Sequence, residues 1–239
     1  MIFSLASLSA HNLEQSVNSE DRSPDNVARD IYRHPYETLS FFGIKPDMTV
    51  VELNPGGGWY TEILANYIHY PGTLITAQGS YYLERFEKKI SSKPMYGRVE
   101  IVNLNSHLAE PNSVDAVITF RNLHNWLGAD MDSIFRSSFK ALKPGGSFGV
   151  VEHRAKPGTD FETMKTSGYV TEDHAIEVAL KHGFELVEKS EINANPKDTK
   201  DHAKGVWTLP PTYRLKNKDR DKYSAIGESD RMTLLFKKP

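Results

Sequence analysis

The stretch Glu52-Leu53-Asn54-Pro55-Gly56-Gly57-Gly58 joins an apolar run to a segment with helical periodicity. The run before it, Thr-Val-Val-Glu-Leu at 49–53, is typical of a buried parallel strand. After the glycines, apolar residues recur at three-to-four spacing from Ile63 to Ile68, which indicates a helix packed on a sheet. Glycines let the main chain turn with positive φ and approach a ligand without a Cβ in between. The stretch therefore predicts a strand, a ligand-binding turn and a helix.

The glycine turn lacks one part of the dinucleotide-binding pattern G-x-G-x-x-G. Its third glycine would fall at Thr61, so the phosphate-binding fingerprint is incomplete and a nicotinamide-dependent oxidoreductase is disfavoured. A carboxylate at the end of the strand, Glu52, instead suits a ligand that carries an ammonium group and no phosphate. We keep the oxidoreductase as an alternative.

Strand and helix patterns alternate on both sides of this turn. Such alternation predicts an α/β fold with a Rossmann-like, doubly wound sheet of seven strands in three layers, α/β/α. We expect strands at 49–53, 73–77, 99–102, 114–120, 147–152, 184–192 and 232–236, and further helices at 23–34, 36–42, 82–90, 131–142 and 172–182.

Composition excludes several functional classes. Lys and Arg total 29 against 31 Asp and Glu, so nothing in the net charge favours nucleic acid or a membrane surface. No apolar run approaches the roughly 20 residues of a membrane-spanning helix. The chain has no cysteine, which rules out disulfides and thiolate zinc sites, and its nine histidines lack a ligand spacing such as H-E-x-x-H, so we expect no metal.

The length of 239 residues fits one domain, which we place at 23–239. Residues 1–22 form a leader, for which two interpretations stay open: a disordered or helical segment, or the remnant of an export signal without its positive start. The compartment is accordingly cytoplasmic by default and periplasmic under the second interpretation. The polar stretch 193–230 is too long for an ordinary connection and is an insertion, a flap or partly disordered.

Two motifs together resemble the class I S-adenosylmethionine-dependent methyltransferase family. These are Val50 to Tyr60 and Leu142-Lys143-Pro144-Gly145-Gly146 before the strand at 147–152, and the resemblance extends over 49–152 and 231–237. It implies an antiparallel last strand, S-adenosyl-L-methionine as methyl donor, and methyl transfer to an acceptor that we expect to be a small molecule. Monomer and homodimer both remain open.

A narrower resemblance involves the two tripeptides that flank this core. Asp21-Arg22-Ser23 and Asp230-Arg231-Met232 are similar to segments of a subgroup of bacterial predicted methyltransferases, some of which look exported.

The resemblance also implies the donor site. Its residues would be Glu52, Asn54, Gly56, Gly57, Gly58, Tyr60, Gln78, Asn105, Ser106 and Asn122. Two positions depart from the family pattern: Gln78 stands where an acid holds the ribose hydroxyls, and Asn105 stands where an acid contacts adenine. These departures motivate a second alternative, a non-catalytic S-adenosylmethionine-binding module of the same fold.

The acceptor side is predicted from the carboxyl ends of the fourth and fifth strands, where ligands of open α/β sheets bind. His124 is the candidate general base, or else it bonds a strand terminus. His153 and Arg154 are expected to face the acceptor. Near the amino terminus, Arg29 and Arg33 belong either to a lid over the donor or to a solvated helix face.

Overall fold

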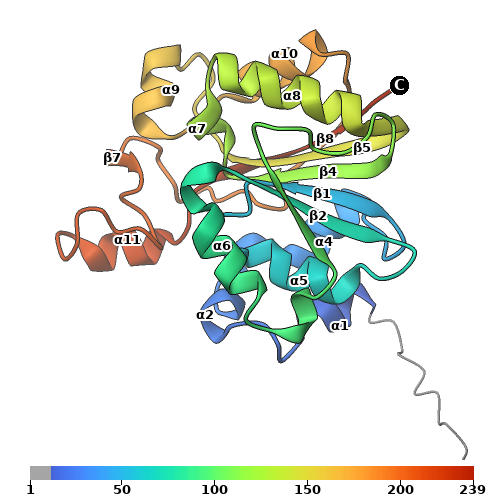
Figure 1. Ribbon diagram of the computed structural model, residues 1–239. Coiled ribbons are helices and arrows are strands. Elements are labelled where there is room, and N and C mark those ends of the chain that lie inside the picture. Colours follow the sequence, from blue (N-terminus) through green and yellow to red (C-terminus); the bar gives the residue numbers. More distant parts are fainter. Residues whose placement is uncertain (1–11) are drawn as a thin grey trace, which may run out of the picture.

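The computed structural model describes residues 12–239, and its central element is a sheet of seven strands in the order β3-β2-β1-β4-β5-β8-β6 (Figure 1). The expected export-signal remnant at 1–10 lies outside the described residues. The strands are β1 Thr49–Leu53, β2 Thr73–Gln78, β3 Val99–Asn103, β4 Val114–Phe120, β5 Leu142–His153, β6 Glu185–Ser190 and β8 Arg231–Lys237.

Strand directions confirm the predicted fold class. Strands β1 to β5 run parallel, with β1 between β2 and β4, whereas β8 is antiparallel to both β5 and β6. The chain order reverses at β1, because β2 and β3 lie on one side of it and β4 and β5 on the other. Such a reversal opens a crevice at the carboxyl ends of the strands, where ligands of α/β proteins bind.

Helices cover both faces of the sheet, which gives the predicted three layers. In Figure 1, α8 and α10 lie above the sheet, and α1, α4 and α5 lie below it. The helices are α1 Leu13–Val17, α2 Pro24–Val27, α3 Asp30–Arg33, α4 Pro35–Phe41, α5 Trp59–Tyr67, α6 Leu83–Ile90, α7 Leu123–Trp126, α8 Ala129–Ala141, α9 Phe161–Ser167, α10 Glu172–Lys181 and α11 Arg220–Ile226, with short 3₁₀ turns at Ser80–Tyr82 and Pro94–Tyr96.

The continuous apolar character of β1 and β4 follows from this arrangement. Successive residues of a strand point to opposite faces. Val50 and Ile118 pack toward α4 and α5, whereas Val51 and Val117 pack toward α8. Both faces are buried, so no polar alternation remains in the sequence.

Residues 12–22, which we expected to precede the domain as a leader, contain helix α1 and pack against the domain. Helix α1 starts with a capping box in which Asn12 and Gln15 exchange side-chain to main-chain hydrogen bonds, and Leu13 and Val17 are buried against α4 and α5. The Arg22 guanidinium pairs with Asp30 at 2.7 Å. These contacts make residues 12–22 part of the folded domain.

The helix expected at 23–34 is divided into α2 and α3. His34 then adopts a left-handed conformation, with φ of 41°, which redirects the chain before Pro35 starts α4. The residue before a proline is disfavoured in the right-handed helical region, which accounts for the break between α3 and α4.

The stretch 193–230 is an ordered insertion. It contains strand β7 Ala203–Val206, outside the seven-stranded sheet, and helix α11, which project together beside the carboxyl ends of the sheet strands (Figure 1). We call residues 203–227 the lobe. The lobe is anchored by buried Asp198, which accepts hydrogen bonds from the Tyr169 hydroxyl and the Asp230 amide. Over residues 12–239, no helix combines the length and apolar character needed to cross a bilayer.

Candidate donor and acceptor site

The glycine turn presents bare main chain to open space. Asn54, Gly56 and Gly58 have φ values of 47°, 58° and 71°, and Gly58 begins α5. A Cβ built on Gly56 or Gly57 would meet no atom within 4 Å. The positive φ values explain why glycine and asparagine stand at the turn, since both residue types tolerate positive φ. The empty surroundings of the two built Cβ positions show that the space beside Gly56 and Gly57 is available to a ligand.

Three side-chain amides hold this turn in place. Asn54 donates to Asn122 Oδ1 at 2.8 Å, Gln78 donates to Asn54 Oδ1 at 3.0 Å, and the Gly56 amide donates to Gln78 Oε1 at 3.1 Å. The chain of bonds links the ends of β4, β1 and β2, so the turn is fixed before any ligand binds. Both ends of the Gln78 amide are used in this network, and its predicted contact with ribose stays a prediction.

Glu52 lies beneath the turn and is almost fully buried. Its carboxylate accepts a hydrogen bond of 2.6 Å from the Thr61 hydroxyl. Burial raises the pKa of Glu52 to about 7, against the opposing effects of Thr61 and Lys89. Glu52 and Tyr60 line a recess of about 20 Å³, and Tyr60 stacks on Phe120 with ring centroids 3.5 Å apart. Within residues 12–239 no Lys, Arg or His nitrogen forms an ion pair with Glu52, so its carboxylate suits an incoming ammonium group.

A pocket of about 240 Å³ adjoins the turn and brings together many of the predicted residues. Its wall is completed by the lobe, including Trp207, Pro210 and Pro211. Of the predicted site residues it is lined by Asn54, Gly56, Gly57, Asn122, His124 and His153.

Among the predicted donor residues that do not line this pocket, Asn105 and Ser106 lie on another strand end. Asn105 and Ser106 are exposed in the loop after β3, where the Ser106 hydroxyl donates to the Asn103 carbonyl at 2.7 Å. Since β3 neighbours β2 in parallel register, the loop stands at the same end of the sheet as Gln78. The adenine contact assigned to it stays a prediction.

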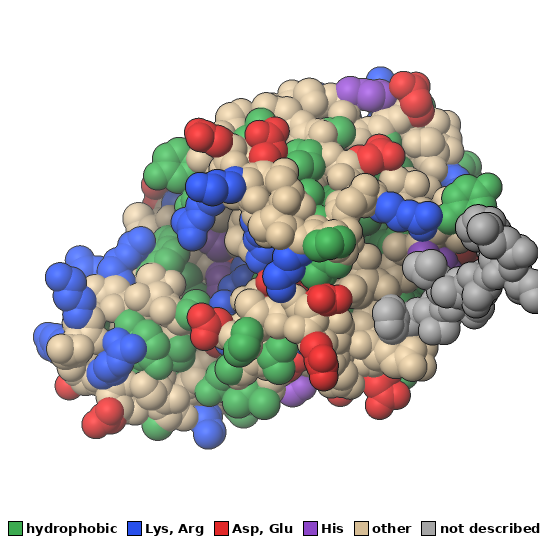
Figure 2. Space-filling view, turned by 60° about the horizontal axis from the view of Figure 1, so that its bottom comes forward, with side chains coloured by type: hydrophobic (Ala, Val, Ile, Leu, Met, Phe, Trp, Pro, Cys, Tyr) green, Lys and Arg blue, Asp and Glu red, His purple; other side chains and the backbone are tan. Residues whose placement is uncertain are grey.

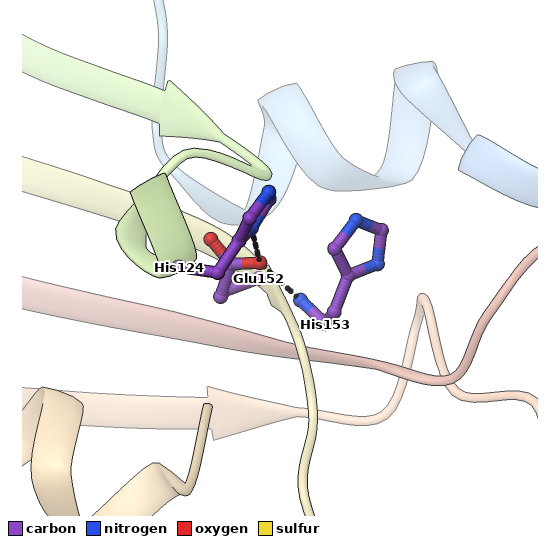
Figure 3. Close-up of side chains that lie close together, drawn as sticks. All are labelled: His124, Glu152 and His153. Carbon is purple, nitrogen blue, oxygen red and sulfur yellow. Dashed lines mark hydrogen bonds and ion pairs between the residues drawn. The ribbon is translucent and has the colours of Figure 1, made fainter. Parts of the chain in front are cut away.

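His124 and Glu152 form a hydrogen-bonded pair at the pocket (Figure 3). His124 Nδ1 lies 2.9 Å from Glu152 Oε1, and the same oxygen accepts from the His153 amide at 2.7 Å. Glu152 is fully buried and also accepts from the Leu123 amide. A carboxylate that accepts at Nδ1 assigns the proton to that nitrogen and leaves Nε2 as the basic one. This geometry makes Nε2 the hydrogen-bond acceptor of the His124 ring.

The cluster His124, Glu152 and His153 also places one ligand atom of each residue within 4.8 Å of the others. Both oxygens of Glu152 already accept N–H bonds, two of them from main-chain amides. A cation would have to displace His124 from the carboxylate. We therefore interpret the cluster as a proton-handling pair beside a second histidine, and not as a metal centre.

His153 stands beside this pair and hydrogen-bonds the Ser229 hydroxyl. Burial, helped by the neighbouring His124 and Arg121, holds the pKa of His153 well below its usual value. His153 is therefore a neutral wall of the pocket.

Arg154 differs from its expected position. Its guanidinium is held by Glu191 at 2.7 Å, Asp230 at 2.9 Å and Glu172 at 3.0 Å, outside the pocket that His153 lines. The physical reason is that successive side chains of a strand point to opposite faces of the sheet. Arg154 therefore points away from the face on which His153 lies. Arg154 fastens the lobe anchor and α10 to the end of β5, and the structure does not bring it to the predicted acceptor site.

Sequence reasoning missed two carboxylates, Glu152 beside His124 and Glu228 in the lining of the pocket. Glu152 had one available signal, a carboxylate at the carboxyl end of an otherwise apolar strand. Arg121 follows β4 directly and lines the pocket together with Glu228. Arg29 and Arg33 contact Glu228 at 2.6 and 3.1 Å, so neither belongs to a solvated helix face.

Comparison with known proteins agrees with this geometry. Residues 51–150 match a family model described as a methyltransferase domain, which spans β1 to β5 and the glycine turn. No curated protein sequence matches the chain.

Many solved structures share the fold at low sequence identity. An S-adenosylmethionine-dependent methyltransferase from Aquifex aeolicus is 16% identical, covering 77% of this chain and 94% of that chain with a TM-score of 0.56. Geranyl diphosphate C-methyltransferase from Streptomyces coelicolor is 10% identical, covering 94% and 87%, with a TM-score of 0.62. The 4+2 cyclase SpnF is 16% identical, covering 95% and 91%, with a TM-score of 0.62. These likenesses show the fold, and the family model adds the methyltransferase domain.

Proposed function

Because residues 51–150 match a methyltransferase domain and the chain shares the fold of S-adenosylmethionine-dependent methyltransferases, we propose that it is such an enzyme and that it methylates a small molecule whose nucleophilic atom carries a proton. The observation that carries this proposal is the pair His124–Glu152 in the same pocket as the open glycine turn. The turn supplies a place for the donor, and the pair supplies a proton acceptor. A binding module without turnover has no need of such a pair.

The residues of the turn fit the methionine end of the donor. The bare main chain at Gly56 and Gly57 leaves space that a Cβ would fill, and buried Glu52 offers a counter-charge for an ammonium group. Bound S-adenosylmethionine would supply a methyl group activated by a positive sulfur. A dinucleotide fits less well for two reasons. Thr61 replaces the third glycine of the phosphate-binding pattern. The Glu52 carboxylate, to which Thr61 donates a hydrogen bond, would repel a phosphate.

The chain's own groups then position the acceptor and move its proton. When the nucleophile takes the methyl group of the bound donor, S-adenosylhomocysteine would be left as the second product, and His124 Nε2 would accept the proton that the nucleophile loses. Glu152 stabilises the resulting imidazolium through Nδ1. Glu152 is a positioning residue, since it acts through His124. General base catalysis contributes about 100-fold to 10,000-fold in comparable sites.

The test has two stages. Thermal unfolding with S-adenosylhomocysteine at a hundred times its Kd should show about 2.7 kcal/mol of stabilisation, whereas NAD should give none. S-adenosylmethionine with a labelled methyl group is then incubated with a small-molecule panel. His124→Gln should lower label transfer at least about 100-fold, while its S-adenosylhomocysteine affinity stays within about threefold of wild type.

The two alternatives give different results. Stabilisation by S-adenosylhomocysteine with no label transferred to any member of the panel would favour the non-catalytic binding module. Stabilisation by NAD alone would establish the oxidoreductase. If His124→Gln transfers label as fast as wild type, the base assignment is wrong even though the donor site stands.

A further inference from the structure

Three arginines surround one buried carboxylate behind the pocket. Glu228 is contacted by Arg29 at 2.6 Å, Arg33 at 3.1 Å and Arg231 at 3.3 Å. These positive neighbours hold the pKa of Glu228 near 2 despite its burial. The carboxylate is therefore ionised and neutralises one of these charges.

A fourth arginine, Arg121, joins this group from the carboxyl end of β4. It lines both the pocket and the recess beside Glu52, and it is not among the arginines that contact Glu228. Its φ of 61° is unusual for a residue with a long side chain, so the surroundings fix its position. Four guanidinium groups against one carboxylate leave three positive charges unbalanced in this cluster.

Several donors of the cluster also lack hydrogen-bond partners. Arg33 is 1% exposed, and within residues 12–239 neither of its terminal nitrogens has a partner. The same holds for Nη2 of Arg29. The ring of Trp59 lies 4.7 Å from the Arg33 guanidinium, which offsets only a small part of the missing solvation.

Buried charges without partners are costly, so a cluster of this kind is expected to meet a counter-ion. Burial and the neighbouring arginines lower the pKa of Arg33, and burial lowers that of Arg121 to about 10. Both pKa shifts indicate that the arginine cluster has more positive charge than its negative neighbours balance. The pocket beside Arg121 and Glu228 is the route by which a counter-ion can arrive.

The methyl donor as a whole does not neutralise this surplus of positive charge. S-adenosylmethionine carries a sulfonium, an ammonium and one carboxylate, and so adds one net positive charge to a region that already has a surplus. Since its carboxylate is matched by its own positive groups, the donor leaves the surplus in place, and a second anion in the pocket would neutralise it.

We propose that the methyl acceptor is an anion, and that Arg121, backed by Arg33, binds its carboxylate or phosphate group. The proposal rests on the proposed function, because it takes the second occupant of the pocket to be the acceptor. Arg121 and His124 are three residues apart and line the same pocket, so an anion held at Arg121 places the rest of the acceptor against the base. Figure 2 shows the hollow beside the lobe, with histidine and Lys or Arg side chains in its depth.

The experiment measures anion binding directly. The purified protein, free and saturated with S-adenosylhomocysteine, is titrated with inorganic phosphate and with acetate at constant ionic strength, and thermal unfolding is followed. We expect saturable stabilisation by at least one of the two anions in both forms. In Arg121→Asn the midpoint of that titration should rise about tenfold or more, since a charge-assisted contact is lost. Asparagine is chosen because it tolerates positive φ.

Matched variants separate charge from folding. Arg98→Asn removes one exposed arginine at the far end of β3 and should leave the titration unchanged. Arg121→Lys should keep part of the anion affinity. S-adenosylhomocysteine affinity should stay within about threefold of wild type in Arg121→Asn.

Two results would overturn the proposal. One is the absence of saturable stabilisation by either anion in the wild-type protein. The other is a loss of S-adenosylhomocysteine affinity in Arg121→Asn while methylthioadenosine, which lacks the amino-acid part, binds as before. The second result would give the arginines to the donor carboxylate. Failure of the wild type to bind S-adenosylhomocysteine would instead count against the proposed function, and the anion titration of the free protein would still test the cluster.

Discussion

Glu52 shows at the residue scale how a binding site and stability oppose each other. Its carboxylate is buried under the glycine turn, and the hydroxyl of Thr61 gives it a single short hydrogen bond. The resulting rise of the pKa from 4.5 to about 7 means that the folded protein holds a proton that the unfolded chain has lost between these pH values. If the Glu52 side chain served only to fill space, replacing it by glutamine would cost the protein no function.

The sign of the pH effect follows from linkage. Below pH 4.5 Glu52 is protonated in both states, and above pH 7 it is ionised in both, so its destabilising effect grows between these values and is complete above 7. Glu52→Gln should remove this effect and raise the free energy of unfolding at pH 8 by up to about 3 kcal/mol. Urea unfolding at pH 5 and pH 8 measures it, and the two proteins should differ less at pH 5.

The same variant should bind the donor less well. An amide cannot balance an ammonium group, so the affinity of Glu52→Gln for S-adenosylhomocysteine at pH 8 should fall about tenfold or more. A variant that is more stable and binds as tightly as wild type would show that Glu52 has no part in the donor site.

At the element scale, the position of β5 depends on its close approach to α4. A Cβ built on Gly149 would lie 2.6 Å from the ring of Phe42, which is almost completely buried. Three residues further along the same strand stands Glu152, the partner of His124. The packing of α4 therefore helps to set where the proton-accepting pair stands.

Gly149→Ala should force Phe42 and α4 outward. Overpacking of this kind costs about 1 to 3 kcal/mol of unfolding free energy. Gly57→Ala is the matched control, because its added methyl meets no atom within 4 Å and its φ is not in the positive region. Urea unfolding should show a loss for Gly149→Ala and little change for Gly57→Ala. Equal stability of the two variants would mean that α4 does not restrain β5.

At the scale of the whole molecule, the pocket is assembled from parts of the chain that are far apart. The turn after β1, the ends of β4 and β5, the lobe, and Glu228 with Ser229 each supply a wall. A ligand between these walls stabilises only those conformations in which they stay together. Binding should therefore reach the lobe as well as the glycine turn.

Hydrogen exchange measures this coupling. Saturation with S-adenosylhomocysteine should slow amide exchange both in residues 56–60 and in lobe residues 203–212, since local opening of either wall is opposed. Exchange at 97–100, at the opposite end of β3, should stay unchanged. In Gly57→Ala, where the methyl occupies the donor's space, the same ligand concentration should give little slowing at any of these places. Slowing at the turn with none in the lobe would show that the lobe is not a wall of the occupied site.

The sequence by itself determined the sheet, its strands and the glycine turn. Strand runs such as Thr49 to Leu53 and the glycines after them act through local rules, namely side-chain alternation and positive φ, which a linear pattern records. For the same reason the sequence predicted more residues for the donor side than for the acceptor side. The packing of residues 12–22 escaped detection because a five-residue helix has too little periodicity to recognise.

Only the tertiary structure decided which charged groups meet. His124 and Glu152 are 28 positions apart, and Arg29 and Glu228 are 199 apart. Their contacts depend on strand register and on the path of the insertion, neither of which leaves a mark in the local sequence. Arg154 is the opposite case, because it is next to His153 in the chain but pairs with three carboxylates outside the pocket. Local patterns fix where a chain turns, whereas pairing of charges is fixed by which elements the folded chain brings together.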